Sequence, residues 1–242
     1  YTNHVALSKA NGVASVAIKL GTRPGDSLIR ASSDDGVNPL TPSFVEFNAR
    51  ALTGSASALT STISAASGLI ANGQEASTVE IVLLDEYRNP VIGKFVSLQA
   101  AGIDIIVNQP SSPTDDNGRT TGSISSINIG TVTIWALADN QPIVSTTVEF
   151  VPGPPVLAMK INDGQTGEKG TPLPQPVGVL LQDAFSHPIK NHRITFSVRR
   201  GKGSIAEAQP CLTNEEGRAM VHWTLGDSLG EQRLRAVIDD MI

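Results

Sequence analysis

Apolar and polar residues alternate with a period of two along much of this 242-residue chain. Val79, Ile81 and Leu83 repeat at every second position, and Val132 and Ile134 do the same in a later segment. A period of two places one set of side chains on one face of an extended segment, as a half-buried β-strand requires. Turns rich in Gly, Pro, Asn and Asp separate such segments. The pattern therefore predicts an all-β protein.

The order of strands and turns recurs about every hundred residues, which predicts tandem copies of one folded unit. Three matching turns end in Gly12, Gly118 and Gly217, at offsets of 106 and 99 residues. Glycine suits these turns because it adopts positive φ angles without strain.

Three further patterns repeat in the same order as these turns. Residues 79–91 match residues 177–189 at an offset of 98, with Asp85, Tyr87 and Pro90 facing Asp183, Phe185 and Pro188. The other two patterns are the strand at 25–31, 130–136 and 230–236, and the Val-Glu-Phe triplet at 45–47 and 148–150.

One copy of the repeat is complete in this sequence. We expect its strands near residues 58–66, 78–84, 94–100, 103–108, 119–125, 131–137 and 143–151. Seven short strands in about one hundred residues predict an immunoglobulin-like β-sandwich. The Pro-rich residues 152–155 form a stiff linker, because consecutive prolines restrict the backbone to extended conformations.

The expected fold class is all-β, as tandem immunoglobulin-like β-sandwich domains of which one is complete and two are partial. Residues 1–50 are expected to be the C-terminal part of a first repeat, 51–151 the complete repeat, and 152–242 a third repeat that lacks its last strand. A partial sandwich exposes its core face, so this sequence is interpreted as an excerpt of a longer array. The alternative is that neighbouring chains add the missing strands.

Composition excludes several classes of function. A net charge of -5 disfavours binding to nucleic acid, and no run of about 18 apolar residues is present to insert into a membrane. Cys211 is the only cysteine, so the sandwiches are predicted to fold without an intramolecular disulfide. Bacterial surface proteins exported as unfolded chains often lack disulfides, so this does not argue against an extracellular location.

At these residues the chain resembles the bacterial Ig-like repeats of the intimin and invasin type. The resemblance rests on Leu84-Asp85 with Asn89-Pro90-Val91 after it, on the turn at residues 114–118 and on the strand at 130–136. It implies rigid stalks on the bacterial surface that project a terminal adhesive domain, with some repeats contacting partners themselves. The cysteine pair of the family's terminal lectin-like domain has no match here, so no receptor-binding residues are carried over.

Histidines and the cysteine are the first candidates for chemistry. His187 and His192 are close in sequence, whereas His4 and His222 stand apart. The sequence shows no third ligand at metal-binding spacing, so the segment that holds His187 and His192 is interpreted as a surface turn. A nucleophile pair of Cys211 with His222 is disfavoured, because nothing brings the two together and no oxyanion motif accompanies them.

Acidic loops are the second candidates. Asp115 and Asp116 beside Asn117, and the pair Asp34 and Asp35, offer oxygen ligands that Ca²⁺ prefers. The pattern is not that of an EF-hand, and the matching turn of the third repeat differs. Solvated turn residues are the favoured interpretation, and no metal site, cofactor or catalytic residue is assigned.

Two tryptophans and one long loop complete the candidates. Trp223 has the parity of a core residue, whereas Trp135 lies on the opposite face of its strand from Val132 and is expected to be partly exposed. A lone aromatic covering a sheet is favoured over a sugar-stacking platform. Residues 164–176 form an expanded loop with Pro172, Pro174 and Pro176, where a binding surface could be built.

Together these observations predict a non-catalytic structural and adhesive stalk module of a bacterial surface protein, anchored elsewhere to the outer membrane. Its expected partners are neighbouring repeats of the same chain and a protein or glycan on a host or cell surface. Two alternatives stay open, namely an accessory Ig-like region of a secreted carbohydrate-active enzyme and a component of a phage fibre.

Overall fold

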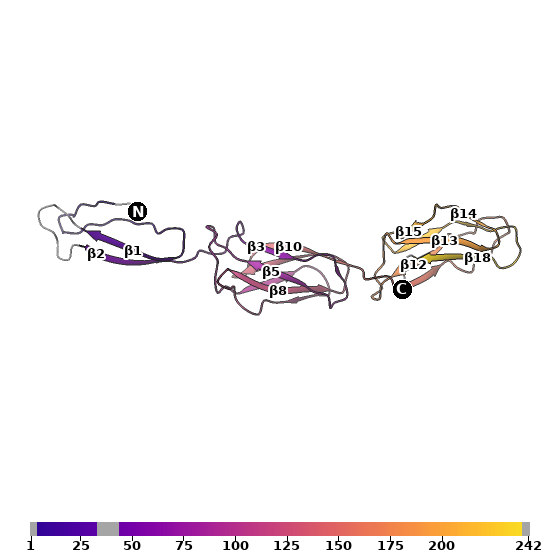
Figure 1. Ribbon diagram of the computed structural model, residues 1–242, viewed down its shortest axis with the longest axis horizontal. Helices are drawn as coiled ribbons and strands as arrows, with labels where there is room; N and C mark the ends of the chain where they lie inside the picture. Colours follow the sequence, from indigo (N-terminus) through magenta and orange to yellow (C-terminus); the bar gives the residue numbers. More distant parts are fainter. Residues whose placement is uncertain (1–3, 33–43, 239–242) are drawn as a thin grey trace.

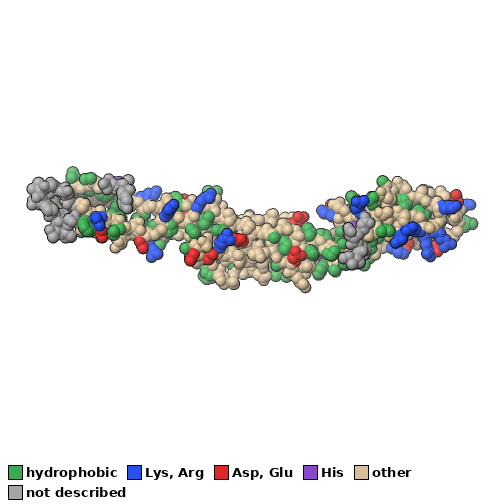
Figure 2. Space-filling model, in the orientation of Figure 1, with side chains coloured by type: hydrophobic (Ala, Val, Ile, Leu, Met, Phe, Trp, Pro, Cys, Tyr) green, Lys and Arg blue, Asp and Glu red, His purple; other side chains and the backbone are tan. Residues whose placement is uncertain are grey.

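The computed structural model describes residues 4–32 and 44–238, and every element in these residues is a β-strand. The strands fall into three groups that follow one another along the long axis of the molecule (Figure 1). The space-filling view gives the outline of a narrow, slightly bent rod (Figure 2). The predicted all-β fold is therefore confirmed.

The first group is a single hairpin. Strand β1 (Gly25–Ser32) pairs antiparallel with β2 (Phe44–Ala51), from Gly25 opposite Ala51 to Ser32 opposite Phe44. Val45 and Phe47 lie on one face of this hairpin, opposite Ala31 and Ile29, and they are 50% and 56% exposed. The hairpin thus presents an apolar face that no other described residue covers.

The repeat would place a strand after Gly12, as one follows Gly118, but no strand forms there. The turn that precedes it is present, with Gly12 at a φ of 78° and the side chain of Asn11 accepting a hydrogen bond from the amide of Val13. Residues 13–18 join no sheet in the described part of the chain. The prediction was wrong here because a matching turn marks where a strand could begin but cannot supply the neighbouring strand that a sheet requires.

The second group is a two-sheet sandwich. One sheet has the order β3-β5-β8-β7 and the other has the order β4-β10-β9-β6. The strands are β3 (Thr62–Ala65), β4 (Leu69–Ile70), β5 (Ser77–Val82), β6 (Val96–Ala100), β7 (Ile105–Asn108), β8 (Arg119–Ser126), β9 (Gly130–Ala138) and β10 (Gln141–Val151). The two sheets enclose one apolar core, in which Ile81 and Ile124 of the first sheet and Ile134 and Phe150 of the second are almost fully buried.

The seven strands expected between residues 58 and 151 all form, and one more appears. Strand β4 has two residues and pairs in parallel with the end of β10, Leu69 opposite Phe150. Such a short segment carries no periodicity, so alternation could not predict it. Its parallel pairing closes one edge of the second sheet.

The third group repeats most of this plan. Its sheets have the orders β11-β12-β16, β15-β13-β18 and β14-β17. The strands are β11 (Leu157–Ile161), β12 (Val177–Gln182), β13 (Arg193–Arg200), β14 (Ser204–Ile205), β15 (Cys211–Leu212), β16 (Arg218–Val221), β17 (Trp223–Thr224) and β18 (Arg233–Ile238). Val179, Ile194, Phe196 and Val221 lie in its core. Among the described residues β18 pairs with β13 alone, whereas the matching β9 pairs with both β6 and β10.

Candidate functional site at the junctions between sandwiches

A buried carboxylate marks the start of the central sandwich. Asp85 follows β5 and is only 2% exposed. Its Oδ1 accepts hydrogen bonds from the amides of Tyr87 and Asn89, both at 2.9 Å, which shapes the turn after the strand. Its Oδ2 accepts a bond of 3.1 Å from the amide of Gly54, in the linker that leaves β2. One carboxylate therefore fixes both a turn and the linker.

The third sandwich repeats this arrangement. Oδ1 of Asp183 accepts bonds from the amides of Phe185 at 2.8 Å and His187 at 2.9 Å, and Oδ2 accepts one of 2.9 Å from the amide of Gly153. Asp183 is also 2% exposed. Because each participant follows its counterpart by 98 or 99 residues, the two junctions are built alike.

The residue four positions after each aspartate reaches back to the preceding unit. Asn89 donates from Nδ2 to the carbonyl oxygen of Thr22 at 2.7 Å. Nε2 of His187 lies 2.8 Å from the carbonyl oxygen of Ile127, in the turn between β8 and β9. Each sandwich is thus joined to the one before it by the linker amide and by one side chain.

Two opposing effects set the charge of these carboxylates. Burial disfavours the ionised form and by itself raises the pKa of Asp85, but hydrogen bonds from Asn89, Gly54 and Tyr87 outweigh it, so the pKa lies below its usual value. Burial likewise raises the pKa of Asp183, and bonds from Gly153, His187 and Phe185 reverse the effect. Both groups therefore favour the carboxylate at neutral pH.

These lowered pKa values predict a loss of stability in acid. A carboxyl group whose folded-state pKa is depressed contributes stability that is complete above its unfolded pKa of about 3.9 and is lost as the pH falls through the lower folded value. We expect the melting temperature to decline below about pH 4, as measured by scanning calorimetry. The double variant Asp85→Asn with Asp183→Asn should show a shallower decline, whereas Asp116→Asn in an exposed loop should follow the parent. An equally steep decline in the double variant would contradict the assignment.

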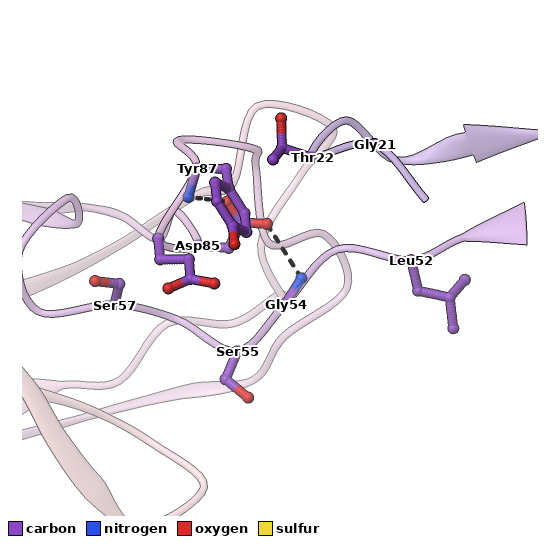
Figure 3. Close-up of a pocket in the computed structure, with 9 residues that line it drawn as sticks. Gly21, Thr22, Leu52, Gly54, Ser55, Ser57, Asp85 and Tyr87 are labelled. Carbon is purple, nitrogen blue, oxygen red and sulfur yellow. Dashed lines mark hydrogen bonds between the residues drawn. The ribbon is translucent and has the colours of Figure 1, made fainter. Parts of the chain in front are cut away.

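A hollow of about 460 Å³ opens at the first junction. Figure 3 shows Asp85 and Tyr87 of the central sandwich facing the linker residue Gly54, with Gly21 and Thr22 of the preceding segment alongside. The Asp85 carboxylate in this lining is already engaged by backbone amides and by Asn89. The hollow is therefore a feature of the hinge between two units.

The histidines lie apart. His4 and His222 are exposed, and the backbone of His192 exchanges hydrogen bonds with Thr213. The surface turn expected around His187 is present, with residues 184–186 exposed, but the His187 side chain itself is only 12% exposed. Burial arises from the contact with the preceding sandwich, which the turn sequence alone could not indicate.

Cys211 and His222 belong to separate contacts. The Cys211 Sγ accepts from the side-chain amide of Gln209 and donates to the carbonyl oxygen of Ala208, whereas Nδ1 of His222 lies 2.6 Å from a carboxylate oxygen of Glu207. Burial raises the pKa of the Cys211 thiol, which disfavours the nucleophilic thiolate.

The acidic loop of the central sandwich is organised by its own backbone. Oδ1 of Asp115 accepts bonds of 2.8 Å from the amides of Asn117 and Arg119, and Asn214 accepts the matching bond from Arg218. The bond from the amide of Arg119 is the main reason that the pKa of Asp115 is lowered. Among the residues that the structure describes, no three His, Cys, Asp or Glu side chains gather at metal-binding distance. Asp34 and Asp35 lie outside the described residues.

The tryptophans pack within the sandwiches, and the expanded loop is held by hydrogen bonds. Trp223 is 9% exposed and packs in the third core, as predicted, and Trp135 is half-buried on β9. The loop that contains residues 164–176 is closed by Gln165, whose side-chain amide donates to the carbonyl oxygens of Asn162 and Gln175. The loop is thus ordered by local hydrogen bonds.

The junction residues were only partly identified from the sequence. The offset of 98 that aligns Asp85 with Asp183 was recognised, but it was interpreted as a turn alone. The linker glycines Gly54 and Gly153 stand 99 residues apart, and that coincidence was the signal that could have connected them to the aspartates.

Comparisons with known proteins agree with this architecture. The family described as bacterial Ig-like domain (group 1) matches residues 57–151. The inverse autotransporter adhesin YeeJ of Escherichia coli K12 is 24% identical over 229 residues, which cover 92% of this chain and 10% of that protein. The chain therefore spans about a tenth of the length of this relative. The resemblance to intimin and invasin repeats is confirmed.

Solved structures show the same fold. Invasin, described as a bacterial integrin-binding protein, superimposes with a TM-score of 0.61 at 19% identity, covering 97% of this chain and 46% of invasin. The Escherichia coli adhesin FdeC gives a TM-score of 0.53 at 15% identity, covering 90% of this chain and 82% of the FdeC chain. No helix in the described residues is long and apolar enough to cross a membrane.

Proposed function

We propose that this chain, whose residues 57–151 belong to the bacterial Ig-like domains of group 1, is a stalk segment of a bacterial surface adhesin that acts as a semi-rigid spacer. The observation that carries the proposal is the repeated junction. At both junctions a buried aspartate binds the amide of the linker glycine, and a side chain four residues later binds a backbone carbonyl of the preceding unit. A linker tied at two points restricts bending, because both contacts must break before the sandwiches can reorient.

The proposed division of the chain follows these junctions. Residues 1–50 form the C-terminal part of one repeat, 51–151 a complete repeat and 152–242 most of a third. Two features of the described residues support this division, namely the exposed apolar face of the β1–β2 hairpin and the pairing of β18 with one strand. The central sandwich covers the equivalent surfaces with its own strands.

The location and partners belong to the same proposal. YeeJ and FdeC are named as adhesins, which supports a place on the bacterial surface with an outer-membrane anchor elsewhere in the full protein. Neighbouring repeats of the same chain are the first partners, since each junction is made by them. A protein or glycan on a host or cell surface is the partner proposed for the adhesive role. The function is carried by spacing and contact, without a catalytic step.

Small-angle scattering tests the spacer role. A compact globule of 242 residues has a radius of gyration of about 18 Å. Strand β10 alone, with 11 residues at about 3.3 Å each, spans roughly 36 Å, so three units in line give a radius of gyration of about 30 Å or more. We expect the larger value and a distance distribution typical of a rod. A value near 18 Å would overturn the proposal.

A further inference from the structure

The second junction depends on an ionisable side chain. His187 is 12% exposed, with Nδ1 2.9 Å from Oδ2 of Asp183 and Nε2 2.8 Å from the carbonyl oxygen of Ile127. Asp183 belongs to the third sandwich and Ile127 to the central one. The imidazole therefore bridges two folded units with both of its nitrogens.

Both partners of this imidazole can only accept hydrogen bonds. A backbone carbonyl carries no proton, and the carboxylate of Asp183 also accepts from the amide of Gly153. A neutral imidazole has one N–H group, whereas the imidazolium ion has two. Only the protonated ring can donate to both partners. In the neutral ring, one nitrogen lone pair faces an acceptor oxygen across less than 3 Å.

At the first junction, the residue equivalent to His187 is Asn89, whose side-chain amide always carries two N–H donors. The Nδ2 group of Asn89 donates to Asp85 and to the carbonyl oxygen of Thr22, and an amide keeps both of its N–H groups at any physiological pH. Asn89 and His187 occupy equivalent positions, 98 residues apart. The two junctions therefore require the same number of donors and differ in whether a proton must supply one.

Three other charged groups on the elements that meet here have hydrogen-bond or ion-pair partners of their own. Asp104 accepts a bond from Asn128, next to Ile127, and Glu75 accepts one from the amide of Ile70, whose side chain lies against the linker. Lys190, three residues after His187, pairs with Glu215.

We propose that His187 is a proton-dependent lock between the second and third sandwiches. With the ring protonated, both bonds hold the third sandwich against the turn at Ile127. Loss of the proton removes one donor, and the third sandwich gains freedom to swing about the linker. The proposal goes beyond the spacer role, because it concerns the stiffness of one junction at a given pH and holds whatever the full-length protein contacts.

Electron paramagnetic distance measurements between units test this lock. In a Cys211→Ser background, nitroxide labels on Ser97→Cys and Arg218→Cys report on the second junction, and labels on Asn48→Cys and Ser97→Cys report on the first. All three positions are exposed. For the second junction we expect a narrow distance distribution at pH 5.5 and a broad one at pH 8. The displaced population should rise about tenfold, which corresponds to about 1.4 kcal/mol for one lost hydrogen bond. The distance distribution across the first junction should be the same at pH 5.5 and pH 8.

Two matched variants decide the cause. His187→Asn copies the donor set of the first junction, and we expect a narrow distribution at both pH values. Asn89→His in the first junction should create the pH dependence there. The proposal is overturned if the parent distribution is the same at pH 5.5 and pH 8, or if His187→Asn broadens as the parent does. Asp183 and Asp85 titrate well below this pH range, so they do not contribute to the pH dependence.

The spacer role is tested by scattering at a single pH, so the two tests can fail independently.

Discussion

Replacing Gly118 by alanine is expected to lower the free energy of unfolding of the central sandwich by about 3 kcal/mol. Gly118 has a φ of 74°, where an L side chain is strained, and a Cβ there would lie 2.3 Å from the carbonyl oxygen of Leu83. That oxygen belongs to backbone, which cannot turn aside as a side chain can. The substitution must therefore shift the turn against the end of β5, and the bond from the amide of Leu83 to the carbonyl of Gly118 weakens with it.

Gly93 provides the control for this prediction. Its φ is 70°, but a Cβ there would meet no atom within 4 Å, so Gly93→Ala isolates the cost of the backbone angle at about 1 kcal/mol. Urea unfolding followed by tryptophan fluorescence measures both variants. A Trp223→Phe background leaves Trp135 of the central sandwich as the only tryptophan. Equal losses for the two variants would show that the contact with Leu83 has no effect.

The same glycine explains why the repeat was visible in the sequence. Gly217 of the third sandwich has a φ of 73°, and a Cβ there would lie 2.5 Å from the carbonyl oxygen of Leu181. At both positions any other residue would meet the same kind of backbone oxygen, so glycine is repeated in the sequence where the turn requires it. Alternating apolar residues such as Val79 and Ile81 are visible for a related reason, because a core face imposes a period of two.

Repeats and alternation in the sequence could not predict the features that depend on contacts between distant segments. The turn at His187 was predicted, but its burial depends on Ile127, 60 residues earlier in the chain. Strand β4 exists because the end of β10 lies beside it, and residues 13–18 join no sheet in the described part of the chain although they follow the same turn as β8. Local pattern specifies which side of a strand is apolar, whereas the neighbour that completes a sheet or a junction is set by the fold.

The aspartates of the junctions lead to the second large effect. Asp183→Ala is expected to lower the free energy of unfolding of the third sandwich by about 3 kcal/mol, because three backbone amides lose their acceptor in a buried site. Asp183→Asn retains Oδ1 for the amides of Phe185 and His187 but replaces Oδ2 by a donor that faces the amide of Gly153. Its cost to the third sandwich should be about 1 kcal/mol, since the turn survives and only the contacts of Oδ2 with Gly153 and with the His187 ring are lost.

This pair of variants separates the stability of the sandwich from the stiffness of the junction. Urea unfolding in a Trp135→Phe background follows Trp223 of the third core and gives the two free energies. Small-angle scattering then measures the radius of gyration. Asp183→Asn should lower this radius at neutral pH although the sandwich stays folded. Equal destabilisation by alanine and asparagine would place the whole effect in the contacts of Oδ2, and an unchanged radius of gyration in Asp183→Asn would mean that these contacts with Gly153 and His187 do not limit bending. The shared geometry of Asp85 and Gly54 extends the same expectation to the first junction, so that Asp85→Asn should loosen the opposite end of the central sandwich by the same mechanism.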